Sequence, residues 1–197
     1  MAEETRESKA YIRKERIPMP ETDSLTSEQR RIVEALTSGP RKGVVGPFIP
    51  LIQCPRLLDL IEPLGAELRF NGTLDRRVRE VVICAVARHT SNQFEMNVHV
   101  PLALESGVSR ASISAVFEER IPAGAPDDER IAVEFAQHLM RNHGIPDSLF
   151  AKVKSLFSNE GVVELTTLVG YFVAVCWIMN VARTKTDEEP EFGLTRG

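Results

Sequence analysis

The feature that most constrains this chain is a long apolar stretch, residues 162–182, near its carboxyl end. The stretch carries one formal charge, Glu164, and only a few small or polar residues such as Gly170 and Asn180. A segment of this length can cross a bilayer, but no hydrophilic loop pairs it with a second span. A helix that is apolar all round is otherwise buried in a core or at a subunit interface, and this is the structure we expect.

Helix-start signals recur along the rest of the chain. Capping residues, or a proline in the first turn, predict helices that begin near Thr26, Pro55, Asp75, Ser91, Ser109, Asp127 and Pro146. The run VVICAVA at 81–87 is rich in β-branched residues, but its length and charged lead-in favour a buried helix over a strand. No segment alternates cleanly with period two. We therefore predict an all-α protein, one compact domain of about eight helices over 17–182, with polar tails at 1–16 and 183–197.

Glycine and proline predict where these helices end or bend. The segment GPRKGVVGPFIP, residues 39–50, cannot continue a helix and is expected to cross the surface as an ordered loop. Pro63 is expected to break or kink the second helix, and Pro101 to bend the fourth. Gly107 and Gly144 are expected to close the fourth and sixth helices.

Composition and charge limit the classes of function. The 197 residues carry a formal net charge of -4, without the basic stripe that nucleic-acid binding needs. The first sixteen residues lack the apolar core of a signal peptide, so we expect a cytoplasmic protein that does not enter a membrane. Cys54, Cys84 and Cys176 are far apart and form no CxxC, which argues against a disulfide framework.

Candidate catalytic side chains gather in the sequence SNQFEMNVHVPLALESG of the fourth predicted helix. Glu95 and His99 are four residues apart, so both face the same way one turn from each other, and Asn92 lies on the same stripe. A carboxylate beside an imidazole raises the pKa of the histidine and selects its tautomer, the arrangement used in general acid–base catalysis. The pair is therefore a candidate site.

Glu80 lies in the preceding helix, with Cys84 one turn further along the same face. The short connection between the two helices predicts an antiparallel hairpin that could bring Glu80 toward His99. Plainer alternatives stay open, because Glu–His pairs at this spacing are common on exposed helices and Glu80 could pair with Arg76 or Arg77.

Arg88, His89 and Tyr171 are further candidates to line the same substrate pocket. His89 is more often a structural or interface residue in such a position, and for Tyr171 core packing is the plainer interpretation. Glu95 and His99 are also metal-ligand types, but no third ligand stands at a convincing spacing, so no metal is expected.

The segment REVVICAVARHTSNQFEMNVHVPLALESGVS, residues 79–109, resembles the carboxymuconolactone decarboxylase family, including its alkylhydroperoxidase D-like branch. The family pattern is a Glu, eleven residues, a Cys, two residues, a second Cys, three residues and a His. This chain keeps that spacing with Glu80, Asn92, Glu95 and His99. Weaker similarity extends to LTSEQRRIVEALTSGPRKGVVGPF before the segment and VVELTTLVGYFVAVCWIMN after it.

The departure from the pattern decides the expected chemistry. In the peroxidase branch the two cysteines are the peroxidatic and resolving pair, whereas here Asn92 and Glu95 occupy those positions and have no sulfur to oxidise. Thiol peroxidase activity by that route is therefore excluded. The chain looks like the decarboxylase branch, which lacks the cysteines, although Met96 stands where members of that branch commonly have Trp.

The resemblance implies a cofactor-free decarboxylation of a small carboxylated lactone or β-keto acid, in a homo-oligomer, often a trimer or hexamer. His99 as imidazolium would stabilise the enolate or protonate carbon, Glu95 would orient His99 or destabilise the substrate carboxylate, and Glu80 would support or relay protons. The substrate itself is not specified by the sequence.

Two other functions stay open at this point. One is redox chemistry on Cys84 as a lone thiol one turn from Glu80, which its apolar surroundings make unfavourable. The other is a different proton-transfer reaction, or a non-catalytic binding or assembly protein that keeps the fold and has lost the chemistry.

Overall fold

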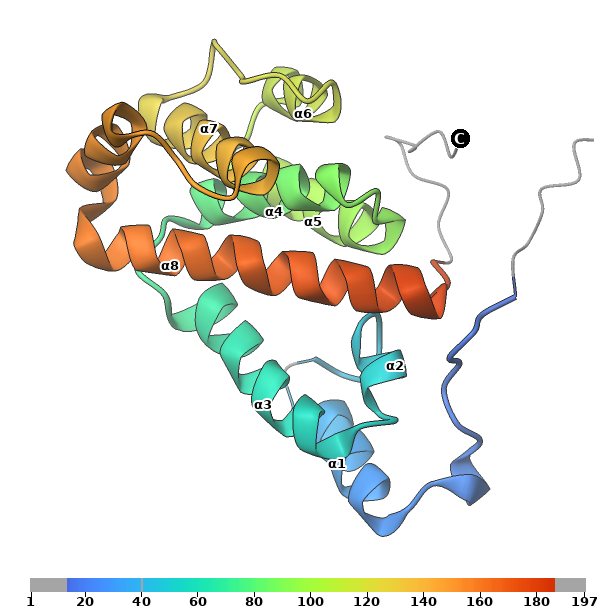
Figure 1. Cartoon of the computed structure of the whole chain (residues 1–197). Helices are drawn as coiled ribbons and strands as arrows, with labels where there is room; N and C mark the ends of the chain where they lie inside the picture. The colour runs from blue at the N-terminus through green and yellow to red at the C-terminus, as the bar shows by residue number, and fades with distance from the viewer. Residues whose placement is uncertain (1–13, 40, 187–197) are drawn as a thin grey trace, which may run out of the picture.

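The computed structural model describes residues 14–39 and 41–186, and in this part of the chain all regular structure is helical (Figure 1). The elements are η1 (Thr22–Ser24), α1 (Ser27–Ser38), α2 (Phe48–Leu51), α3 (Pro55–Ala66), the π-helical turn η2 (Glu67–Asn71), α4 (Arg76–His89), α5 (Gln93–Glu105), α6 (Arg110–Phe117), α7 (Asp127–Asn142) and α8 (Asp147–Ala182). The predicted all-α fold is confirmed. Most of both predicted tails lies outside the described residues.

Helix α4 is the centre of the fold. Its residues 81–87 are at most 3% exposed, and α5, α6, α7 and α8 all pack against it. The side chain of Asp75 caps its first turn by accepting a hydrogen bond from Arg77 N at 2.8 Å. The run VVICAVA is thus a helix buried on every face, as its length and charged lead-in predicted.

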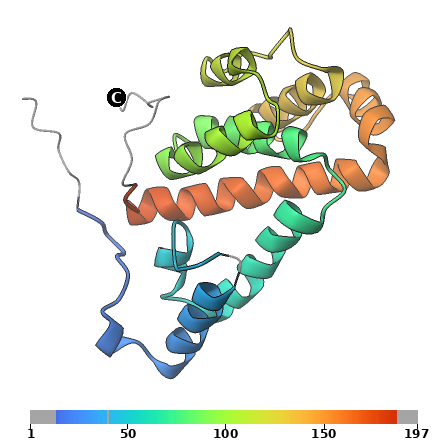
Figure 2. The same ribbon diagram turned by 180° about the vertical axis from the view of Figure 1, so that it is seen from behind.

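Helix α8 contains a sharp break at Ser158, whose φ of 61° and ψ of -179° are not helical. The break separates the two helices that the sequence predicted at this end of the chain. The long second part lies across the middle of the molecule, with α4, α5 and α7 on one side and α1–α3 on the other (Figures 1 and 2).

One face of this second part is buried and the opposite face is open. Leu165, Leu168 and Phe172 belong to the core, whereas Val163, Trp177 and Val181 are 66%, 61% and 61% exposed. Within the single chain the helix is therefore not buried all round, and burial of its open face at a subunit interface stays a prediction. By length and composition alone α8 could also cross a membrane, and 39% of its most apolar window is buried against the other helices.

The one charge in the apolar stretch, Glu164, joins α8 to the start of α4. Its carboxylate accepts hydrogen bonds from Thr73 N at 2.7 Å, Thr73 Oγ1 at 2.6 Å and Leu74 N at 3.3 Å. These backbone donors precede α4 and have no partner within that helix. The charge is retained in an apolar helix because it satisfies them.

The helix boundaries differ from the predictions at three places. The segment 39–50 ends within α2, whose Phe48 and Leu51 are 3% and 4% exposed in the core beside α1, so the segment does not simply cross the surface. Pro63 lies inside α3 without ending it, and the helix instead widens into the π-helical turn η2. Helix α7 ends at His143, which itself adopts the left-handed conformation expected of Gly144.

Candidate active site

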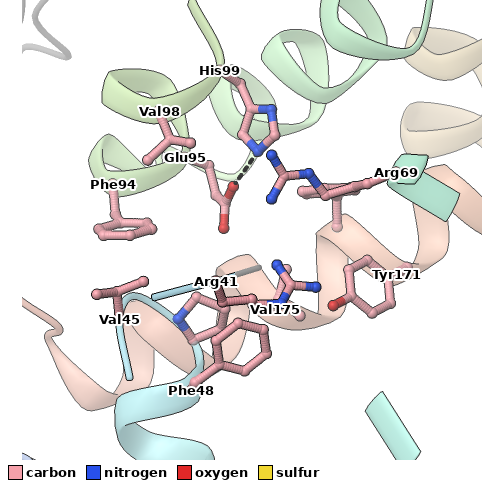
Figure 3. A pocket seen from close by; sticks show the side chains of 12 residues that line it. Arg41, Val45, Phe48, Arg69, Phe94, Glu95, Val98, His99, Tyr171 and Val175 are labelled. Atoms are coloured by element: carbon pink, nitrogen blue, oxygen red, sulfur yellow. Dashed lines mark ion pairs between the residues drawn. The ribbon is translucent and has the colours of Figure 1, made fainter. Parts of the chain in front are cut away.

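A small cavity of about 90 Å³ lies where α5, α8, η2 and the segment before α3 meet. Its lining residues are Arg41, Val45, Pro47, Phe48, Arg69, Phe94, Glu95, Val98, His99, Tyr171, Phe172 and Val175 (Figure 3). Most of this wall is apolar, and the polar groups are few and convergent. Such a combination is typical of a small-molecule site.

A buried Glu–His–Glu cluster forms the acid–base part of this wall. His99 Nδ1 lies 2.6 Å from Glu80 Oε2, and His99 Nε2 lies 3.1 Å from Glu95 Oε2 (Figure 3 shows the second contact). The exposed fractions are 3% for Glu80, 4% for Glu95 and 2% for His99. Helices α4 and α5 thus form the predicted hairpin that brings Glu80 to His99.

The contacts of His99 with Glu80 and Glu95 require a proton on each hydrogen bond, which is one more proton than a neutral imidazole between two carboxylates has. A neutral imidazole has one ring nitrogen without hydrogen, and here that nitrogen would face the lone pairs of a carboxylate oxygen. Either His99 is an imidazolium or one of the two carboxyl groups is protonated. Because Glu95 and His99 line the cavity and Glu80 does not, this proton can be delivered into the cavity.

The electrostatics favour the imidazolium. Burial lowers the pKa of His99, but the hydrogen bonds to Glu80 and Glu95 outweigh burial, and the net pKa lies above its ordinary value. Burial raises the pKa of Glu80, but the hydrogen bond to His99 and the positive charges of His99, Arg69 and Arg79 together outweigh burial, so the net pKa lies below its ordinary value. The group that faces the cavity is therefore a proton donor held by two acceptors.

Three other predicted pocket residues lie outside the cavity. Asn92 is 2% exposed and caps α5 by accepting from Glu95 N at 2.9 Å, while its amide donates to Cys176 O and Asn180 Oδ1. Arg88 donates to Phe117 O at 2.6 Å at the far side of α4, and His89 is exposed at its end. These side chains are committed to the fold or to solvent, so the substrate-binding prediction is not supported for them.

Tyr171 does line the cavity, as predicted. Its hydroxyl lies against Gly65 of α3, where an added Cβ would be 2.1 Å from the oxygen. Burial raises the pKa of Tyr171 to about 12, so it stays a neutral phenol at ordinary pH. It can donate or accept one hydrogen bond at the edge of the cavity.

Two arginines of the cavity were not identified from the sequence. Arg41 comes from the segment before α2, far from the motif in the chain, and Arg69 comes from η2, which ends shortly before the motif begins. Neither stands at a recognisable spacing from Glu80 or His99, so only the tertiary structure could identify them. Together with the Glu–His–Glu cluster they make the site a cavity with cations on one side and a proton donor on the other.

The described residues do not favour thiol or metal chemistry at this site. Cys84 is fully buried, and burial raises the pKa of its thiol, so it has neither the thiolate nor the access that a reactive cysteine needs. Both ring nitrogens of His99 already face carboxylate oxygens. No group of three or more His, Cys, Asp or Glu arranged to hold a metal occurs in the described ranges.

Comparison with known proteins supports the family resemblance. The sequence model of the carboxymuconolactone decarboxylase family matches residues 55–138, which include Glu80, Glu95 and His99. No curated protein matches the chain.

Solved structures share the fold. A peroxidase-related protein from Ralstonia eutropha JMP134, an alkylhydroperoxidase AhpD core, superposes with a TM-score of 0.73 at 16% identity, over 88% of this chain and 93% of its own. A peroxidase-related protein from Silicibacter sp. TM1040 superposes with a TM-score of 0.67 at 14% identity, over 87% of this chain and 91% of its own. A protein of unknown function from Agrobacterium tumefaciens superposes with a TM-score of 0.59 at 19% identity, over 71% of this chain and 96% of its own. At these identities the likeness establishes the fold.

Proposed function

We propose that this chain, whose residues 55–138 match the carboxymuconolactone decarboxylase family, is a cofactor-free decarboxylase of a small carboxylated lactone or β-keto acid. The observation that carries the proposal is the buried Glu80–His99–Glu95 cluster, which presents a proton to an otherwise mainly apolar cavity. Loss of carbon dioxide from such an acid leaves its electron pair in an enolate. A proton donor beside the carbon completes the reaction.

The roles follow from the positions of the three side chains. The C–CO₂ bond breaks, its electron pair moves into the unsaturated carbonyl system, and the imidazolium of His99 transfers its Nε2 proton to the carbon. A proton from solvent then restores the imidazolium, which Glu80 stabilises by holding Nδ1 from behind. Glu95 lines the cavity and, through its contact with Nε2, keeps the ring of His99 in place.

The apolar wall supports the same chemistry. Phe172 packs edge-on against the ring of His99 with centroids 5.3 Å apart, and Val98 and Val175 complete this side of the cavity. Exclusion of water strengthens the charge interactions in the cluster and protects the enolate from uncontrolled protonation.

The test is carbon dioxide release from carboxymuconolactone and a set of β-keto acids by wild type, His99→Gln and a matched control, His89→Gln. His99→Gln is expected to lower kcat by about 10²–10⁴-fold, the usual contribution of a positioned general acid. His89→Gln should leave kcat unchanged because His89 is exposed outside the cavity.

Release that survives in His99→Gln would contradict the assigned role. No release by wild type from any of these acids would overturn the proposal and leave a proton transfer without decarboxylation, or a binding role.

We also propose that the protein forms a homo-oligomer in which a second copy covers the exposed face of α8. Val163, Trp177 and Val181 form an apolar strip on that face, which is costly to leave in water. Light scattering measures the mass in solution, and a monomer at all concentrations would contradict this arrangement.

A further inference from the structure

The cation side of the cavity contains two guanidinium groups that the rest of the described chain does not satisfy. The side chain of Arg41 is 10% exposed, and its Nε donates to Glu62 Oε1 at 2.9 Å, but its Nη2 is buried without a hydrogen-bond partner. The Nε of Arg69 is buried without a partner as well. Buried donors are expensive to leave unpaired, so a missing partner is expected at both atoms.

Both guanidinium groups are held in place by their surroundings. The guanidinium carbon of Arg41 lies 4.6 Å above the ring of Phe48, and that of Arg69 lies 5.2 Å from the ring of Phe70. In Figure 3 both groups point into the same space as the carboxylate of Glu95, with Tyr171 beside them. A planar fork held in this way is preorganised for a carboxylate.

The charge balance of the site leaves room for one anion. Three carboxylates lie in or directly behind this region against three guanidinium groups: Glu62, Glu80 and Glu95 against Arg41, Arg69 and Arg79. The imidazolium of His99 adds one positive charge. A net positive charge in a buried site is stabilised by one bound monoanion.

We propose that Arg41 and Arg69 form a clamp for one carboxylate group of the substrate. The inference rests on the proposed function for the reaction, but the clamp itself is a binding site that can be tested without turnover. The substrate class is a small organic acid with an apolar body, because Phe48, Phe94 and Val175 line the space beside the clamp. Bound in this way, the body of the acid extends toward Glu95 and His99.

The volume of the cavity limits which organic acids can bind. A closed cavity of about 150 Å³ is enough to hold benzene, whereas this one is about 90 Å³. Short aliphatic acids therefore fit the structure as it stands. A ring-sized acid requires the lining of the cavity to move outward.

The test is a nuclear magnetic resonance titration of the full chain with propanoate and with its neutral isostere propanamide. Propanoate is expected to bind and propanamide not to bind. Arg69→Gln and Arg41→Lys should each weaken propanoate binding about tenfold or more, because each variant loses charge-assisted hydrogen bonds to the carboxylate. Arg41→Lys keeps a charge opposite Glu62, so the variant retains that ion pair.

The matched control is Arg31→Gln. Arg31 pairs with Asp59 on the surface with its side chain 57% exposed, so its loss should leave propanoate binding unchanged. Equal affinities in wild type and Arg69→Gln, equal binding of propanamide, or no propanoate binding would each overturn the clamp. Tighter binding of inorganic phosphate than of propanoate, with the same arginine dependence, would also overturn it and identify a tetrahedral oxyanion site.

The clamp and the decarboxylase proposal can fail separately. Arginine-dependent propanoate binding in a protein that releases no carbon dioxide would support the clamp and remove the proposed reaction. Carbon dioxide release that depends on His99, without arginine-dependent propanoate binding, would support the decarboxylase proposal and remove the clamp.

Discussion

The two sides of the cavity are built from different kinds of structure. The acid–base side stands on α4 and α5, two full helices packed together in the core, and its polar atoms contact one another at 2.6 and 3.1 Å. The cation side stands on a glycine-containing segment and a π-helical turn, and it keeps buried donors without partners. The polar atoms of the acid–base side thus satisfy one another within the chain, whereas the cation side has buried donors that lack a partner in the described chain and that the proposed anion would satisfy.

The largest expected effect is on the stability of the acid–base side. Glu80→Ala removes a buried carboxylate from the imidazolium of His99 and should lower the free energy of unfolding by about 3–5 kcal/mol. Urea unfolding at neutral pH measures it. The control is Glu105→Ala, whose side chain is 66% exposed in a surface pair with Arg76 and should cost no more than about 1 kcal/mol. Similar losses for the two variants would mean that the buried cluster is not the special element of this side.

A smaller loss of stability is expected from a substitution on the cation side, Gly46→Ala. This residue has φ of +57°, and an added Cβ would lie 2.3 Å from the ring of Phe94, so Gly46→Ala should cost about 1–3 kcal/mol in unfolding free energy. Because Phe94 lines the cavity, propanoate binding should weaken as well. Gly144→Ala is the control, since it has open space and no positive φ. Unchanged stability in Gly46→Ala would show that the segment adapts more freely than its packing indicates.

The smallest effect is a pH dependence that separates the two sides. The raised pKa of His99 contributes stability that is fully present below its ordinary pKa of about 6.5 and is lost as pH rises through the raised pKa. A single proton limits the slope to about 1.4 kcal/mol per pH unit. Wild type should therefore lose unfolding free energy over this range relative to His99→Gln, whereas Arg69→Gln should follow wild type. Parallel curves for wild type and His99→Gln would contradict a raised pKa.

Most of the helical framework followed from local signals. Helix α1 begins near Thr26 as predicted, where Thr26 and Gln29 form a capping box with both reciprocal hydrogen bonds. Capping at Asp75 and Ser109 is likewise a short-range property, because it depends on residues within one turn. The prediction failed at Phe48, which lies in the short helix α2 and packs in the core. At Pro63 the predicted break is absent because α3 continues to Ala66, and the alternative, a kink, stays a prediction.

By itself, the sequence determined the all-helical class, the burial of α4, and the placement of Glu95 and His99 on one face of α5. Helical periodicity and residue spacing are enough for each of these. Only the tertiary structure decided that Glu80 reaches His99 and does not pair with Arg76 or Arg77, that Asn92 is a cap and not a ligand group, and that Arg41 and Arg69 enter the cavity. The reason is physical: those contacts join residues far apart in the chain, and their partners are chosen by how the helices pack.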